Sequence, residues 1–155
     1  MKRKSSCSDV QQLAEKLMIN EFSGQLGREL GKATIPIGRG VKVTVDGFHR
    51  DDNRVTLVEA WAHVGKAKSA QRNKVLGDML KLALVTSVLR RSRPDLKIES
   101  YLVFADRTAA GVVSGNGWAS HAAKEFGIET RVIPLSSEVI NTIKEAQVKT
   151  GHPYG

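Results

Sequence analysis

The first thirty residues carry apolar side chains at the three- and four-residue spacing of helices. Ser8 is placed to cap a first helix, and a second helical stretch covers residues 20–30. Gly31 follows that stretch directly, where a glycine commonly closes a helix. We therefore expect two short helices before the first strand. Their apolar positions are Val10, Leu13, Leu17 and Met18 in the first helix, and Phe22, Leu26 and Leu30 in the second.

The pattern then changes to the two-residue period of strands. Residues 41–46 alternate between apolar and polar, and residues 47–54, which are rich in Gly, Asp and Asn, have the composition of a turn. Residues 55–63 are apolar at nearly every position, which is typical of a central strand covered on both faces. The two strands are therefore expected to form a hairpin or a near-hairpin.

Helices and strands alternate through the rest of the chain. A loop containing Gly65 leads into a long helix over residues 70–91, and Pro94 prevents this helix from continuing. Strand 97–106, helix 118–127, strand 128–135 and helix 136–150 follow. This order predicts an α/β fold with a mixed central sheet flanked by helices. Residues 1–155 contain no repeat and no linker, so we expect one domain with a basic N-terminal tail over residues 1–7.

The charge of the chain narrows the class of partner. The 155 residues include 24 Lys and Arg against 16 Asp and Glu, which gives a net charge of +8. This favours a polyanionic partner, most simply nucleic acid, over a soluble protein that is basic by coincidence. The single cysteine, Cys7, fits a reducing compartment, and no apolar run is long enough to serve as a secretion signal or to span a bilayer. We expect a cytoplasmic protein with no membrane partner.

Two carboxyl groups stand where the core is expected. Asp46 ends the first strand, and Glu59 lies in the middle of the apolar second strand, on the same face as Trp61 and His63. A hairpin would bring the two acids together, where they repel each other unless a cation or a proton lies between them. Oxygen pairs of this kind hold Mg²⁺ beside phosphate groups. Two plainer interpretations stay open: an Asp-Gly turn at Asp46, and a Glu59 carboxylate paired with Lys or Arg.

The order of elements and the acid pair resemble the PD-(D/E)XK nuclease superfamily, which has the restriction-endonuclease-like fold. The resemblance covers most of the chain, from a leading helix through the acid-bearing hairpin and the long helix to the last strand. It implies a metal-dependent, endonuclease-like protein that acts on the phosphodiester bonds of nucleic acid, with DNA favoured. Asp46 and Glu59 would hold Mg²⁺ or Mn²⁺ with help from the carbonyl of Ala60, and a carboxylate near the leading helix, Glu29 or Glu21, would assist.

The sequence departs from the superfamily pattern at the catalytic lysine. That residue would follow Glu59 by two positions, where this chain has Trp61, and Val45 stands where the motif has proline. Trp61 is expected in the core more than against a nucleic-acid base. His63 is interpreted as a residue that caps the end of a strand more than as a base or a metal neighbour.

A lysine from elsewhere can orient and polarise the attacking water, and the superfamily is known for lysines that have migrated. We expect Lys74 to take this role, with Lys68 as the second choice and Gln71 orienting the water from the preceding turn of the same helix. Basic residues near the acid-bearing strand and after the following strand are the expected contacts with nucleic acid. They are Lys66, Lys68, Arg72 and Arg107.

The missing lysine leaves two other functions open. The chain can be a nuclease-like fold without catalysis that serves as a nucleic-acid-binding or assembly module. It can also be a nucleotide-binding α/β domain that uses the glycine loop at residues 115–118, where a helix begins. A homodimer is a further candidate for the assembled state. Metal uptake at Asp46 and Glu59 distinguishes the nuclease from the nucleotide-binding domain.

Overall fold

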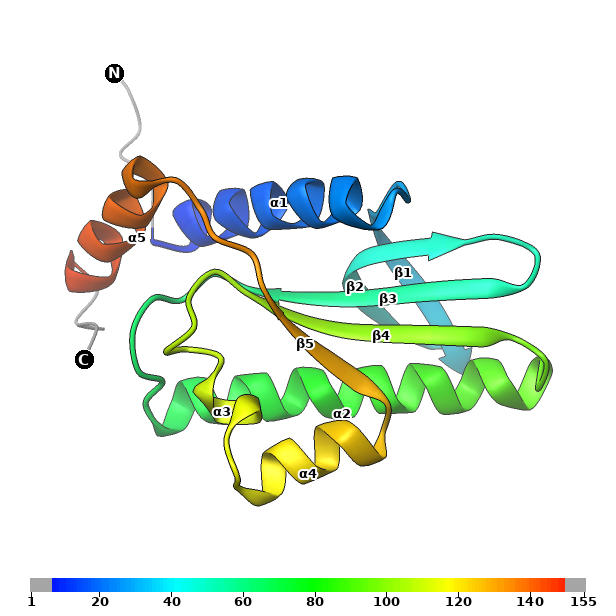
Figure 1. Ribbon diagram of the computed structural model, residues 1–155. Coiled ribbons are helices and arrows are strands. Elements are labelled where there is room, and N and C mark those ends of the chain that lie inside the picture. Colours follow the sequence, from blue (N-terminus) through cyan, green and yellow to red (C-terminus); the bar gives the residue numbers. More distant parts are fainter. Residues whose placement is uncertain (1–6, 150–155) are drawn as a thin grey trace.

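A five-stranded sheet forms the middle layer of the protein, and helices cover both of its faces (Figure 1). The computed structural model describes residues 7–149. The elements are α1 (Cys7–Leu26), β1 (Gly31–Gly38), β2 (Val41–Arg50), β3 (Arg54–Trp61), α2 (Ser69–Ser92), β4 (Lys97–Phe104), α3 (Gly111–Ser114), α4 (Trp118–Glu125), β5 (Ile128–Val132) and α5 (Ser137–Lys149). Helices α1 and α5 lie on one face of the sheet, and α2, α3 and α4 lie on the other. The predicted α/β class, with a mixed sheet flanked by helices, is confirmed.

The strands lie in the order β1-β2-β3-β4-β5. β1, β2 and β3 form an antiparallel meander, whereas β3, β4 and β5 run parallel to one another. β3 is therefore the strand at which the sheet changes from antiparallel to parallel. Every residue of β3 except its first and last is buried, which confirms a central strand covered on both faces.

Each face of the sheet packs its own apolar core. The buried residues of α2 recur at three- and four-residue steps, which places one face of the helix against the sheet. The core under α2 includes Leu57, Val75, Met79, Leu82 and Phe104. The core under α1 and α5 includes Met18, Phe22, Val58, Val103 and Ile143.

The N-terminal part of the chain differs from the prediction in two ways. Residues 7–26 form one continuous helix instead of two, because the buried positions of both predicted helices fall on a single stripe. The chain leaves this helix at Gly27, whose φ of 65° is the left-handed conformation in which helices commonly end. Residues 31–38, for which no strand was predicted, form the edge strand β1. Pro36 lies within it, and an edge strand tolerates a residue that cannot donate a hydrogen bond.

β2 is longer than predicted and continues through Asp46 and Gly47 to Arg50. The interpretation of Asp46 as the start of a turn is therefore wrong. The pairing of β1 with β2 shifts its register around these two residues, which together oppose Lys32. Such a bulge turns side chains to new directions without ending the strand.

Gly47 lets α1 approach β2 closely. A Cβ atom at this position would lie 3.1 Å from Val58 Cβ and 3.2 Å from Ile19 Cδ1. The glycine is thus required by the approach of a helix to the sheet and not by a turn.

The expected basic tail, residues 1–7, lies outside the described residues except for Cys7, at which α1 begins. Within residues 7–149, no helix has both the length and the apolar character needed to cross a bilayer.

The buried side-chain amide of Gln147 attaches α5 to the loop after β3. Gln147 Oε1 accepts a hydrogen bond from the N–H of Val64 at 3.1 Å, and its Nε2 donates to the carbonyl of Val64 at 3.2 Å.

Candidate active site

The two acids predicted from the sequence lie where β2 and β3 separate. The ladder between these strands reaches Gly47 and Val58, after which β3 continues alone beside β4. The N–H of Ala60 donates a hydrogen bond to Asp46 Oδ2 at 2.9 Å, so the side chain of β2 satisfies an amide of β3 beyond the ladder. The Asp46 side chain is therefore held beside Ala60, the residue that follows Glu59 in β3.

Glu59 is a buried carboxyl group with one oxygen paired and one unpaired. Only 3% of the residue is exposed. Its Oε2 lies 3.0 Å from Lys81 Nζ, whereas its Oε1 is buried without a hydrogen-bond partner among the residues that the structure describes. A buried oxygen of this kind is costly unless a further ligand or a proton satisfies it.

Lys81 reaches the acid pair from the helix on the other side of the core. Its Nζ donates to the carbonyl of Thr44 on β2 at 2.9 Å and lies 3.7 Å from Asp78 Oδ1, one turn earlier on α2. Three acceptors from three elements thus fix one ammonium group beside Glu59. The plainer interpretation of Glu59, a carboxylate paired with a basic residue, therefore holds for Oε2.

A fourth carboxyl group approaches from α1. Glu15 and Asp46 line the same hollow of about 530 Å³, between α1 and the β1–β2 pair. Lys16 and Lys32 also line this hollow. Asp46 is therefore accessible from the α1 side, while Lys81 contacts the buried Glu59 from the α2 side.

Burial, together with repulsion between neighbouring carboxyl groups, raises the pKa values of the acids in this cluster. Burial, followed by Asp46 and then Asp78, raises the pKa of Glu15 to about 7. The same causes raise the pKa of Glu59 to about 8 against the opposing effect of Lys81. Burial and the Asp46 carboxylate also raise the pKa of Asp78. Burial lowers the pKa of Lys81, but Glu59 and Asp78 outweigh it and raise the value above that of an ordinary lysine.

Asp46 and Glu59 are the two carboxyl groups that could contribute to a site for a small, hard cation with further ligands from outside the chain. Among residues 7–149, no three Asp, Glu, His or Cys side chains are arranged to hold a metal ion by themselves. Mg²⁺ is usually bound through one or two carboxylates, with waters and substrate phosphates as the remaining ligands. Asp46 and the unpaired Oε1 of Glu59 are two such donors. Asp46 accepts a hydrogen bond from Ala60, the residue that follows Glu59.

The lysines expected from the sequence lie elsewhere. Lys74 is exposed on α2, one turn before Asp78, and Lys68 is exposed just before α2 begins. Gln71 serves the start of this helix, because its Oε1 accepts a hydrogen bond from the N–H of Lys68 at 2.7 Å. Lys81, and neither Lys74 nor Lys68, is the lysine seen in contact with Glu59.

The carboxylates expected to assist from near the leading helix, Glu29 and Glu21, also lie outside the acid cluster. Glu29 follows the end of α1 and is exposed, and its carbonyl lies 3.0 Å from Nδ1 of His49. Glu21 is exposed on α1. Glu15, two turns nearer the N-terminus than Glu21, is the α1 carboxyl that interacts electrostatically with Asp46.

The four cations expected to contact nucleic acid come from neighbouring loops. Lys66, Lys68 and Arg72 lie between β3 and the first turn of α2, Arg107 follows β4, and all are exposed. The N–H of Gly65 donates to Asp106 Oδ2 at 2.8 Å, which ties these two loops together (Figure 1). Asp106 also accepts from the N–H of Ala109, so it organises a turn.

The aromatic residues after Glu59, Trp61 and His63, pack inside the protein. Trp61 packs against the core under α2, as expected. His63 is buried, with its ring 5.9 Å from that of Trp61 and its Nδ1 3.5 Å from Gln71 Nε2. At the glycine loop, Gly117 precedes the first residue of α4, and Trp118 is 70% exposed.

Sequence periodicity could have found the three residues that were missed. Glu15 precedes the buried Met18 by three positions and Ile19 by four, and Lys81 precedes the buried Val85 by four. Charged residues at these positions point toward a core and not toward solvent. Asp78 follows the same rule, since it lies three positions after Val75.

The cluster thus joins acids of β2, β3 and α2 near Lys81, and Glu15 of α1 interacts electrostatically with Asp46. Compared with models of known protein families, with curated proteins and with solved structures, the chain shows no match. Its function is therefore inferred from this geometry and not from a relative.

Proposed function

We propose that this protein is a metal-dependent nuclease that hydrolyses phosphodiester bonds of nucleic acid. One observation carries the proposal: Asp46 and Glu59 meet where β2 and β3 separate, with a buried, unpaired Glu59 oxygen and the ammonium of Lys81 beside them. Carboxylate oxygens next to a lysine are the groups that position a metal and stabilise charge on a phosphate.

The arrangement of elements supports a restriction-endonuclease-like fold, as the resemblance to the PD-(D/E)XK superfamily implies. α1 precedes an antiparallel meander, α2 crosses over between the parallel strands β3 and β4, and the acids lie on β2 and β3. The superfamily's first acid is then Asp46 and its second acid is Glu59. Glu15 takes the place proposed for Glu29 or Glu21 as the assisting carboxyl of the leading helix.

The residues of the site divide into two roles. Asp46 and Glu59 hold Mg²⁺ or Mn²⁺ with the carbonyl of Ala60. The bound ion would polarise the phosphate and stabilise the leaving oxygen. Lys81 replaces the lysine that Trp61 displaces from the motif, because its ammonium orients the attacking water and offsets the charge that develops on the phosphate.

The substrate is nucleic acid, with DNA favoured, and the site is matched to it by charge. The chain carries a net charge of +8, and only four of its 16 acidic residues lie in the cluster. The exposed cations Lys66, Lys68, Arg72 and Arg107 would bind the phosphate backbone on either side of the scissile bond. The single cysteine fits a reducing compartment and so agrees with a cytoplasmic location.

Cleavage of plasmid DNA and of RNA, in Mg²⁺, in Mn²⁺ and in chelator, tests the proposal. Wild type should cut only with the divalent ion, and Glu59→Gln and Asp46→Asn should abolish cutting. Both substitutions keep the shape of the side chain, and the amide oxygen that Asp46→Asn introduces would still accept the hydrogen bond from Ala60. Glu29→Gln, at an exposed carboxyl outside the cluster, is the matched control and should cut like wild type. Equal cutting by Glu59→Gln and wild type would place the activity elsewhere.

A nucleic-acid-binding module without catalysis is the second candidate. The observation that favours it is that Trp61 fills the motif position and Lys81 already neutralises one oxygen of Glu59. Under this alternative, wild type binds nucleic acid, cuts nothing in any divalent ion, and shows no metal uptake by calorimetry.

A further inference from the structure

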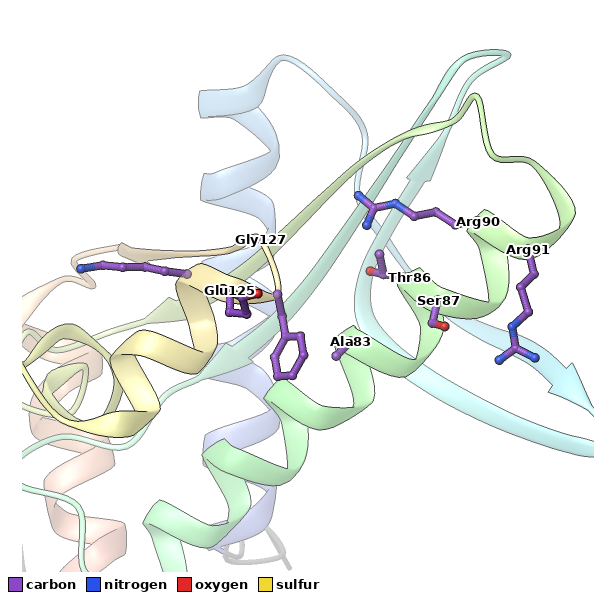
Figure 2. Close-up of a pocket in the computed structure, with 9 residues that line it drawn as sticks. Ala83, Thr86, Ser87, Arg90, Arg91, Glu125 and Gly127 are labelled. Carbon is purple, nitrogen blue, oxygen red and sulfur yellow. The ribbon is translucent and has the colours of Figure 1, made fainter.

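A second hollow lies on the other flank of α2, away from the acid cluster. It has a volume of about 660 Å³ and opens between the C-terminal half of α2 and the end of α4 (Figure 2). We call it the arginine hollow. Its lining residues are Ala83, Thr86, Ser87, Arg90, Arg91, Lys124, Glu125, Phe126 and Gly127.

The arginine hollow is strongly basic. Arg90, Arg91 and Lys124 supply three cations against the single carboxylate of Glu125. None of the three cations forms an ion pair with a carboxylate within residues 7–149. In Figure 2 the side chain of Arg90 runs from α2 toward the side where Gly127 lies, whereas that of Arg91 points away from it. Arg90 is therefore placed to contact an anion in the opening, and the charges of Arg91 and Lys124 add to the positive potential of the hollow.

An aromatic ring is exposed in the same hollow. Phe126 is 49% exposed although phenylalanine is usually buried. Its backbone is fixed, because its N–H donates to the carbonyl of Ala122 at 2.9 Å and the next residue, Gly127, turns the chain with a φ of 66°. The residue is thus held at the surface in a basic hollow, and about half of it remains exposed.

We propose that the arginine hollow binds a single-stranded segment of nucleic acid. A base stacks on Phe126, and Arg90, Arg91 and Lys124 contact the phosphates on either side of it. An exposed aromatic ring in a basic groove is the arrangement that binds single strands without reading their sequence. A duplex does not fit this role, because the faces of its bases are already stacked on one another.

This site is distinct from the acid cluster. Lys81 leaves α2 toward Thr44 and β2, whereas Ala83, Ser87 and Arg90 leave it toward α4. The proposal goes beyond cleavage and does not require that the acid cluster be active.

Fluorescence anisotropy of labelled oligo(dT), measured at low salt in chelator so that no cleavage takes place, tests the proposal. Phe126→Leu should weaken binding by about tenfold, the order of magnitude of one base stacked on an aromatic ring. Trp118→Leu removes the exposed aromatic residue at the other end of α4, outside the hollow, and should change nothing. Phe126→Tyr keeps the ring and should bind like wild type.

The cations are tested in the same assay. Arg90→Gln combined with Arg91→Gln should weaken binding and make it less sensitive to salt, whereas Arg93→Gln should not, since Arg93 lies outside the hollow and pairs with Asp95. Equal effects of Phe126→Leu and Trp118→Leu on oligo(dT) binding, or equal effects of Phe126→Leu on the binding of oligo(dT) and of a duplex of the same length, would overturn the proposal. Because binding is measured in chelator and cleavage with the divalent ion, failure of the nuclease and failure of this site are separately visible.

Discussion

Lys81 Nζ lies 3.0 Å from Glu59 Oε2, so a lysine of α2 contacts the buried carboxyl of β3 directly. The residue two positions after Glu59 is a tryptophan that packs against the core, and the motif lysine is therefore absent from β3. A positive group nevertheless stands beside the acid, supplied by a different element. This contact supports the proposal of catalysis despite the altered motif.

Lys81→Met is expected to slow cleavage by about 100-fold, because removing one preorganised donor from a reacting centre typically costs this much. Metal uptake measured by calorimetry should persist, since Asp46 and Glu59 remain. Stability should fall by about 1–3 kcal/mol, because Glu59 then loses its partner while it stays buried. Rate assays and thermal unfolding of the same preparation measure these effects.

Lys74→Ala is the comparison for that variant, since Lys74 is exposed one turn before Asp78 on the same helix. It should cut at nearly the wild-type rate. If Lys74→Ala or Lys68→Ala is slow while Lys81→Met is fast, the acid site stands and Lys81 has been assigned the wrong role.

Thermal stability should fall as the pH rises from about 5 to 8.5. Burial and the neighbouring Asp46 raise the pKa of Glu15 to about 7, so the folded chain holds this proton more tightly than the unfolded chain does. The free energy of unfolding therefore decreases with pH between the unfolded pKa, near 4.5, and the folded one. Glu59 adds to the same trend. We expect a decrease of about 3–6 °C in the melting temperature.

Glu15→Gln should reduce this pH dependence, and Glu21→Gln, on the exposed side of the same helix, should not. Mg²⁺ added at pH 8 should restore part of the lost stability, because the ion binds the folded state alone. A melting temperature that stays constant or rises over this pH range contradicts the crowded-carboxylate interpretation.

Binding of duplex DNA should weaken steeply with salt, because the protein releases counterions as it neutralises phosphates. Arg107→Gln should lower the slope of log affinity against log salt by about one, and so should Lys66→Gln. Lys97→Gln should leave the slope unchanged, since Lys97 begins β4 at the opposite end from Arg107 and pairs with Glu99. If none of these substitutions alters the slope, the interface with DNA lies elsewhere on the protein.

Gly47→Ala should destabilise the protein by about 1–3 kcal/mol, because the added Cβ would overpack the contact between α1 and β2. Gly24→Ala should instead stabilise it by about 0.5–1 kcal/mol, since Gly24 lies in α1 with open space around it and alanine favours helix. Urea unfolding of the two variants gives both values. Similar effects of the two substitutions would show that the close approach at Gly47 does not matter.

The acids of the site were predictable because they break a local pattern. Glu59 interrupts an apolar strand, and Asp46 ends an alternating stretch, so both could be singled out by position. The assisting groups were harder to find. Glu15, Asp78 and Lys81 fall on helical stripes that are otherwise apolar. On a long helix with several charges, however, such a residue can be identified only if it is known which helix face is buried.

The sequence by itself determined the alternation of helices and strands, the central place of β3 and the acid pair, because these depend on the local spacing of apolar residues. Only the tertiary structure decided which lysine reaches Glu59, which acid of α1 approaches Asp46, and that Gly47 belongs to a bulge and not to a turn. These facts depend on how α1 and α2 cross the sheet, and a crossing is set by the packing of two faces at once. No local pattern contains that information, since each contact joins residues that are far apart in the chain.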